Sequence, residues 1–218
     1  MTRPALRFNA PLGDARAVEL AERALEVRPT VVVDFGCGRG EFLLAVIAAG
    51  EGVRGVGVDV DTEALDAARA AFAARGLGEQ ATFVAADART YTGDADVVIS
   101  IGASHAFDGL AAMLASLPGS RAVVGDAFWQ STPDDWCLET FGDLPTGIEA
   151  MQAVASAAGW RVTDVDVSTL AEWDTFEETW RRGVSAGLAA ERKAEYEERY
   201  RGVLGFAWLV LDRRPKSS

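Results

Sequence analysis

Histidine and cysteine are scarce in this sequence. Its 218 residues contain one histidine, His105, and two cysteines, Cys37 and Cys137. Zinc sites are usually built from several Cys and His ligands, so the chain does not offer such a cluster. Nor do two distant cysteines suggest the disulfide framework that staples small secreted domains. We expect no metal and no disulfide.

Long apolar runs are also missing. The longest, residues 42–49, is far shorter than the ~20 residues needed to cross a bilayer. The first ten residues, MTRPALRFNA, lack the apolar core of a signal peptide. These absences favour a cytoplasmic protein without a membrane partner.

Positive charge is in deficit. The chain has 21 Lys and Arg residues against 33 Asp and Glu residues, a formal net charge of −12. Such a chain repels a phosphate backbone unless a local basic patch compensates, and the sequence shows none. We therefore expect a small-molecule partner and no nucleic acid, in a monomer or homodimer.

Short β-branched runs alternate with Ala-rich segments of helical period. This alternation is typical of βαβ units around a parallel sheet, so the predicted fold class is α/β. Strands are expected near 31–35, 54–59, 81–85, 95–100, 121–126, 160–169 and 202–214, and helices over 17–27, 41–50, 61–76 and 146–159. A further helical stretch rich in charge, 172–201, precedes the last strand.

The length favours a single domain over residues 1–218. Within it we distinguish an N-terminal helical region (1–29), a first half (30–130) and a second half (131–218) with a helical insertion at about 170–201.

The stretch VVVDFGCGRGEF, residues 31–42, places three glycines at alternate positions after a strand. Gly36, Gly38 and Gly40 allow positive φ angles and close approach of a ligand to the backbone. A dinucleotide fingerprint would need a glycine where Glu41 stands, which disfavours NAD. A P-loop would need a lysine, which this loop lacks, so ATP is disfavoured too.

Asp34, just before the glycines, suits a cationic ligand. The stretch resembles the first motif of the class I S-adenosylmethionine-dependent methyltransferases, and the resemblance continues through about the first 130 residues. It implies a seven-stranded, mostly parallel, doubly wound sheet with helices on both faces, and S-adenosyl-L-methionine as the cofactor. In the loop it implies cofactor contacts from Asp34, Gly36, Cys37, Gly38 and Gly40.

The resemblance also implies roles further along the chain. Asp59, 25 positions after Asp34, matches the acid that binds the ribose hydroxyls, and Val60 beside it would lie against the adenine. Asp87 matches the acid that holds the adenine amino group, next to the Ala88 amide. Ser100 and Ile101, at the end of the fourth strand, would lie beside the methionine moiety.

Each of these residues also has a simpler interpretation. A strand-end aspartate such as Asp59 or Asp87 is as often a helix N-cap as a ligand. Cys37 is better explained as a small buried residue than as a nucleophile.

His105 lies just after the fourth strand, near the place where the methyl acceptor must be aligned. An imidazole ordinarily titrates close to neutral pH and can act as a general base, so His105 is the candidate catalytic residue. The alternative is that it caps a helix beginning near Phe107.

Candidate acceptor-binding residues are Asp126 and Trp129, which follow the fifth strand, and Trp173 in the insertion. Aromatic faces and a carboxylate suit an amine or a flat ring. Trp173 belongs to a stripe with Phe176 and Trp180 that is more typical of a core. The resemblance implies that such an insertion covers the site in bacterial small-molecule methyltransferases.

The expected activity is transfer of a methyl group to an oxygen or nitrogen of a small metabolite. The sequence has no Asn-Pro-Pro-Tyr-type motif after the fourth strand, which argues against methylation of a nucleobase or a glutamine amide. The alternatives are a protein methyltransferase and a non-catalytic regulatory protein that binds S-adenosylmethionine or S-adenosylhomocysteine.

Overall fold

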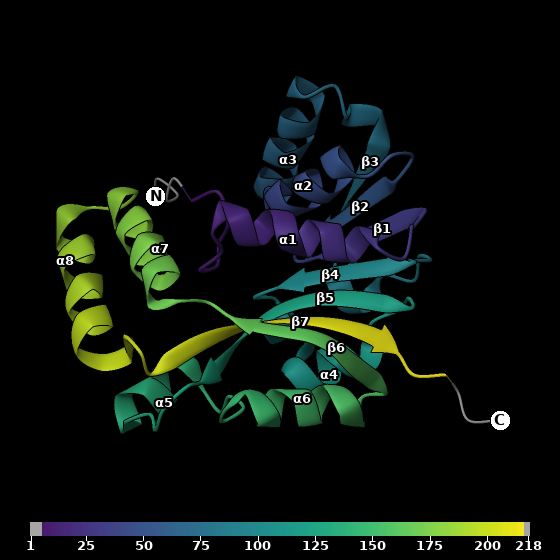
Figure 1. Cartoon of the computed structure of the whole chain (residues 1–218). Coiled ribbons are helices and arrows are strands. Elements are labelled where there is room, and N and C mark those ends of the chain that lie inside the picture. The colour runs from purple at the N-terminus through teal and green to yellow at the C-terminus, as the bar shows by residue number, and fades with distance from the viewer. Residues whose placement is uncertain (1–5, 216–218) are drawn as a thin grey trace.

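One twisted sheet organises the chain, and Figure 1 shows it in the computed structural model, which describes residues 6–215. The sheet has seven strands in the order β3-β2-β1-β4-β5-β7-β6. They are β1 (Val31–Phe35), β2 (Arg54–Asp59), β3 (Ala81–Ala85), β4 (Val97–Ile101), β5 (Arg121–Trp129), β6 (Trp160–Val167) and β7 (Leu204–Arg213).

Strands β1 to β5 are parallel, and β7 runs antiparallel between β5 and β6. From β1 the chain winds outward to β2 and β3 and then returns to β4 on the other side of β1. The carboxyl ends of β1 and β4 therefore form a topological switch point, where open α/β sheets bind ligands. The predicted class I α/β fold is confirmed.

Helices cover both faces of the sheet (Figure 1). Side chains of α1, α2 and α3 share a core with one face, and those of α4 and α6 share a second core with the other. The helices are α1 (Asp14–Leu25), α2 (Glu41–Ala49), α3 (Thr62–Ala74), α4 (Leu110–Ser116), α5 (Asp135–Phe141), α6 (Ile148–Ala157), α7 (Leu170–Arg182) and α8 (Ala186–Glu195). Shorter helical turns are η1 (Gly78–Gln80), η2 (Ala88–Thr90), η3 (Ser104–Phe107) and η4 (Tyr196–Tyr200).

Local signals explain several helix boundaries. The Asp61 carboxylate accepts a hydrogen bond from the Ala64 amide and begins α3, as predicted. Helix α2 ends at Gly50. Thr169 and Glu172 form a reciprocal capping box at the start of α7.

Three helical segments differ from the prediction. The charged stretch over 172–201 is two helices, because α7 ends at Gly183 and the Ser185 hydroxyl caps α8. Helix α4 begins at Leu110 and not near Phe107, since the turn η3 comes first and Gly109 breaks the helix with a φ of 110°. Helix α5 was not predicted.

Strand β5 is buried on both faces, so its alternate residues belong to different cores. Ala122 and Val124 face α4 and α6, whereas Val123 and Trp129 face the other core. Strand β6 forms one edge of the sheet and has an irregularity between Val162 and Asp164. No helix within residues 6–215 is both long and apolar enough to cross a membrane.

Candidate active site

A cavity of about 770 Å³ lies at the carboxyl ends of β1, β2 and β4. Its volume is in the usual range for small-molecule sites. Segments from both ends of the sequence line it: the N-terminal segment, the glycine loop, the turns after β2, β3 and β4, and the last turn of α7. The lining residues used below are Leu6, Arg7, Phe8, Asn9, Leu12, Asp34, Gly36, Cys37, Gly38, Asp59, Val60, Asp87, Ala88, Arg89, Ile101, His105, Asp108 and Trp180.

The glycine loop presents bare backbone to this cavity. Gly38 has a φ of 51°, and a Cβ atom built on it would meet nothing within 4 Å, so a side chain there would project into open space. A Cβ on Gly36 would instead lie 2.6 Å from the Ala103 Cβ.

Gly40 has a different role from the one predicted. It precedes α2 with a φ of 71°, and a Cβ there would lie 3.2 Å from Ala68 and Phe83. Gly40 therefore allows the loop to pack against α3, and it is not among the residues that line the cavity.

Asp34 places a buried carboxyl group at the floor of the cavity. The residue is 4% exposed, and within the described part of the chain its carboxyl group has no hydrogen-bond or ion-pair partner. Burial raises its pKa well above the ordinary value, and the neighbouring Asp59 raises it further. An unpaired acid in this position favours a cationic ligand.

Asp59 braces the glycine loop. Its Oδ2 accepts a hydrogen bond from the Gly38 amide at 2.7 Å, and its Oδ1 accepts one from the Asp61 amide at 2.9 Å. Because Asp61 is the N-cap of α3, the alternative interpretation of Asp59 as the helix cap is wrong. Both oxygens are held at the cavity wall, and Val60 beside it is an exposed part of that wall.

Asp87 does act as a cap. Its Oδ1 accepts a hydrogen bond from the Arg89 amide at the start of η2, and its carboxylate pairs with the Arg89 guanidinium at 2.6 Å. The Arg89 hydrogen bonds hold the pKa of this carboxylate below its usual value. Asp87 and Ala88 both line the cavity, so capping and ligand binding are compatible here.

Cys37 lines the cavity as a protonated thiol. Burial raises the pKa of this thiol, and the charges of Asp34 and Asp59 raise it further. A thiolate nucleophile is therefore disfavoured at neutral pH.

His105 reaches the cavity from the turn η3. The following helix α4 has Gly109 as its N-cap, so His105 is not the helix cap. This position beside the cavity makes it available for proton transfer.

Ser100 does not reach the cavity, in contrast to the prediction. Its side chain is fully buried on the other face of β4, where its hydroxyl contacts the Met113 sulfur at 3.1 Å. Because side chains alternate along a strand, only its neighbour Ile101 faces the cofactor side.

Asp126 is also absent from the residues that line the cavity. It is buried on β5, where its Oδ1 accepts a hydrogen bond from the Ala127 amide. Burial raises its pKa, while Ser104, the Ala127 amide and His105 offset part of that rise.

Trp129 and Trp173 belong to an aromatic core and do not line the cavity. Trp129 packs edge to face on Phe141, and Trp173 on Phe176 and Tyr200. The residue of α7 that lines the cavity is Trp180, seven positions later. The helical spacing of Trp173, Phe176 and Trp180 predicted the helix, but it did not predict which of these aromatic residues faces the cavity.

One wall of the cavity was not predicted from the sequence. Residues 6–13, which we call the N-terminal strap, have no helix or strand and contribute five lining residues. No motif or periodicity marks them. They are Leu6, Arg7, Phe8, Asn9 and Leu12.

Comparison with known proteins agrees with this geometry. The family model described as methyltransferase domain matches residues 32–118, which include the glycine loop and the ends of β2, β3 and β4. The match covers 87 of the 218 residues, and the fold is similar to that of the class I S-adenosylmethionine-dependent methyltransferases.

Several individual proteins are similar over most of the chain. A methyltransferase from Geobacter sulfurreducens, solved with S-adenosyl-L-homocysteine, has a TM-score of 0.81 and 24% identity, over 96% of this chain and 95% of that one. The uncharacterised protein YjhP of Escherichia coli K12 is 26% identical over 87% of this chain and 84% of its own. Its solved structure has a TM-score of 0.82 over 96% of each chain.

A shorter similarity involves a protein-modifying enzyme. The ribosomal protein L11 methyltransferase of Pectobacterium atrosepticum is 27% identical over 64% of this chain, but this covers only 46% of that enzyme.

Proposed function

We propose that the cavity holds S-adenosyl-L-methionine and that the protein transfers its methyl group to an oxygen or nitrogen of a small metabolite. The observation that carries this proposal is the buried, unpaired Asp34 carboxyl group beside the open backbone at Gly38. The bound cofactor supplies an electrophilic methyl group on a positively charged sulfur. Its positive charges, from the sulfonium and the ammonium, match an acid that has no hydrogen-bond or ion-pair partner among residues 6–215.

The other cofactor contacts follow from the cavity wall. The fixed carboxylate of Asp59 faces the ribose, Val60 lies against the adenine, and Asp87 with the Ala88 amide receives the adenine edge. Ile101 adds an apolar contact near the methionine part. Of the loop residues, Gly36, Gly38 and Cys37 line the cofactor side.

The acceptor binds where Phe8, Leu12 and Trp180 line the cavity. Apolar side chains from the strap and from α7 both face this space, which supports a small acceptor over a polypeptide. His105 lies where it can remove the acceptor's proton, while alignment of the nucleophile with the methyl group provides the rest of the rate enhancement.

A protein acceptor is the second candidate, because part of the chain is similar to the ribosomal protein L11 methyltransferase. Incubation of the protein with methyl-labelled S-adenosylmethionine and cell extract, divided into a small-molecule and a macromolecular fraction, separates the two. We expect label in the small-molecule fraction. Label confined to protein would favour the second candidate, and binding of the cofactor without any transfer would contradict both.

A further inference from the structure

The N-terminal strap forms part of the cavity wall without secondary structure of its own. An irregular segment needs contacts with the rest of the fold to stay in one place. Phe8 and Leu12 provide apolar anchors in the main core. At its outer end, Arg7 pairs with Glu41, directly after the glycine loop, and with Asp14.

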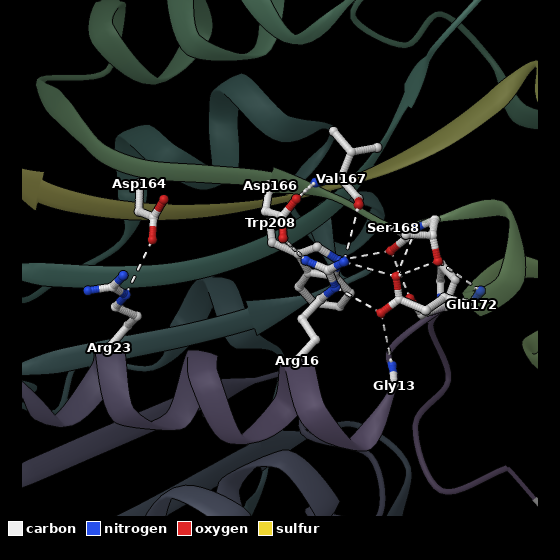
Figure 2. A network of polar contacts seen from close by, with 11 residues as sticks. Gly13, Arg16, Arg23, Asp164, Asp166, Val167, Ser168, Glu172 and Trp208 are labelled. Carbon is white, nitrogen blue, oxygen red and sulfur yellow. Dashed lines mark hydrogen bonds and ion pairs between the residues drawn. The ribbon is translucent and has the colours of Figure 1, made fainter.

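The inner end of the strap is bound by the junction between β6 and α7. The Ser168 hydroxyl donates a hydrogen bond to the Pro11 carbonyl at 2.7 Å and accepts one from the Trp208 indole. The Gly13 amide donates to Glu172 Oε1 at 3.3 Å. Figure 2 shows Ser168, Trp208, Gly13 and Glu172 clustered at the start of α1. Segments more than 150 positions apart are thus joined at one point.

The centre of this junction is an ion pair between Arg16 and Glu172. The guanidinium donates two hydrogen bonds, Nε to Oε1 at 2.8 Å and Nη2 to Oε2 at 2.9 Å (Figure 2). The side chains are only 12% and 16% exposed, so water screens the pair less than a surface pair. The same carboxylate accepts from the Thr169 amide and hydroxyl. Glu172 therefore fixes α1, the strap and the first turn of α7 together.

The protonation of the pair agrees with this arrangement. Burial alone would raise the pKa of Glu172, but hydrogen bonds from Arg16 and Thr169 lower it overall. The hydrogen bonds that Arg16 donates to Glu172 raise the pKa of Arg16 above its ordinary value despite partial burial. Both groups are charged at neutral pH.

Helix α7 connects this ion pair to the other side of the cavity. Trp180 lies eight residues after Glu172, about 12 Å along the helix axis. Its ring is covered by the Arg192 guanidinium at 4.0 Å, and Arg192 makes two 2.8 Å hydrogen bonds to the fully buried Glu177. Helix α7 thus links the ion pair in its first turn to Trp180 in its last turn.

We propose that Arg16 and Glu172 are positioning residues of the active site, whose ion pair holds the strap and α7 in the arrangement that binds cofactor and acceptor. Neither residue lines the cavity. The inference rests on the proposed function. Without the pair, the strap and Trp180 must be ordered at the moment of binding, which weakens affinity.

A matched control exists at the opposite end of the strands, at the first residue of β5. The Arg121 side chain is 9% exposed, close to the 12% of Arg16, and it makes ion pairs with Asp212 at 2.8 Å and with Glu26 at 2.9 Å. It too joins α1 to the sheet through distant residues, but it does so far from the strap and the cavity. Replacing Arg121 therefore shows how much the loss of a buried ion pair far from the cavity changes stability and cofactor affinity.

The test compares Arg16→Gln, Glu172→Gln and Arg121→Gln with the wild type. We expect the first two to raise the Kd for S-adenosylhomocysteine by about tenfold or more, by calorimetry, and to speed proteolysis of residues 6–13. Glu172→Gln keeps a helix-capping side chain, so α7 still begins at the same residue. Arg16→Lys keeps the charge and should lie between wild type and Arg16→Gln. Arg121→Gln should lower Tm but leave Kd within twofold.

The outcomes are distinct. A Kd within twofold of wild type in both Arg16→Gln and Glu172→Gln overturns the inference, as does an equal loss of affinity in Arg121→Gln. If Arg16→Gln fails to fold, Glu172→Gln still breaks the same ion pair, and a Kd within twofold of wild type in that variant alone then overturns the inference. A wild-type protein that binds no S-adenosylhomocysteine overturns the proposed function, and this inference with it.

Discussion

The two walls of the cavity are built in different ways. The sheet-side wall comes from short loops after β1, β2, β3 and β4, all within residues 34–108, and its main groups are backbone atoms and strand-end carboxylates. The opposite wall combines the strap with Trp180, which are separated by most of the sequence and joined through side-chain contacts such as the pair of Arg16 with Glu172. The first wall is therefore set by the order of the parallel strands, whereas the second depends on side-chain contacts between distant segments.

The largest expected effect lies in the backbone of the sheet-side wall. Gly38→Val places a branched side chain in the cavity, so we expect binding of S-adenosylmethionine to be lost in calorimetry while the protein stays folded by circular dichroism. Gly52→Val is the control, since Gly52 also has a positive φ and open space around it but does not line the cavity. Wild-type affinity in Gly38→Val would remove the loop from the site.

Replacing His105 tests whether the sheet-side wall also takes part in proton transfer. If its imidazole accepts the acceptor's proton, His105→Ala should lower kcat by about 10² to 10⁴-fold with nearly constant cofactor affinity. Steady-state kinetics and calorimetry measure the two quantities separately. Activity within a few fold of wild type would mean that alignment alone suffices and that the acceptor is already a good nucleophile, such as a neutral amine.

Asp59→Ala and Asp134→Ala should separate a loss of cofactor binding from a loss of fold stability. Loss of the charged hydrogen bonds of Asp59 should weaken cofactor binding by roughly 1.5 to 3 kcal/mol, about 10- to 150-fold in Kd. Asp134→Ala removes a true helix cap, at the start of α5, and should lower stability by about 1 kcal/mol without changing Kd. Equal Kd values for Asp59→Ala and wild type would contradict the ribose assignment.

Asp34 should make the stability of the cofactor-free protein depend on pH. Its raised pKa means that the folded protein binds a proton more tightly than the unfolded chain does, so the cofactor-free protein loses stability as pH rises above about 4. Asp34→Asn should flatten that part of the profile in denaturant unfolding and weaken cofactor binding. A variant with the wild-type pH profile would show that the Asp34 carboxyl group does not couple to folding.

Ser100→Ala should have the smallest effect. Its hydroxyl faces Met113 and not the cavity, so Kd and kcat should stay within twofold of wild type. A clear loss of affinity in calorimetry would restore the cofactor role that the sequence suggested.

The sequence predicted the sheet-side wall well and the other wall poorly, for a physical reason. Asp34 and Asp59 lie at the carboxyl ends of β1 and β2, and Gly38 follows β1. The carboxyl ends of neighbouring parallel strands lie at the same edge of the sheet, so a pattern in the sequence can place these residues together. Which face a strand-end side chain takes depends on register, and this is where the prediction for Ser100 was wrong. The position of Trp180 depends on how α7 packs against distant elements, which no local pattern encodes.

The carboxylates of β6 that pair with α1 also lie on an edge strand of the sheet. Asp164 and Asp166 pair with Arg23 and Arg16, and the irregularity at Val162 disturbs the regular row of backbone donors and acceptors along this edge. An open strand edge invites pairing with the same edge of another copy, and charged side chains together with a bulge are the usual defences. The aspartates that pair with α1 are thus also charged side chains on an edge strand, the arrangement that disfavours edge-to-edge pairing of sheets.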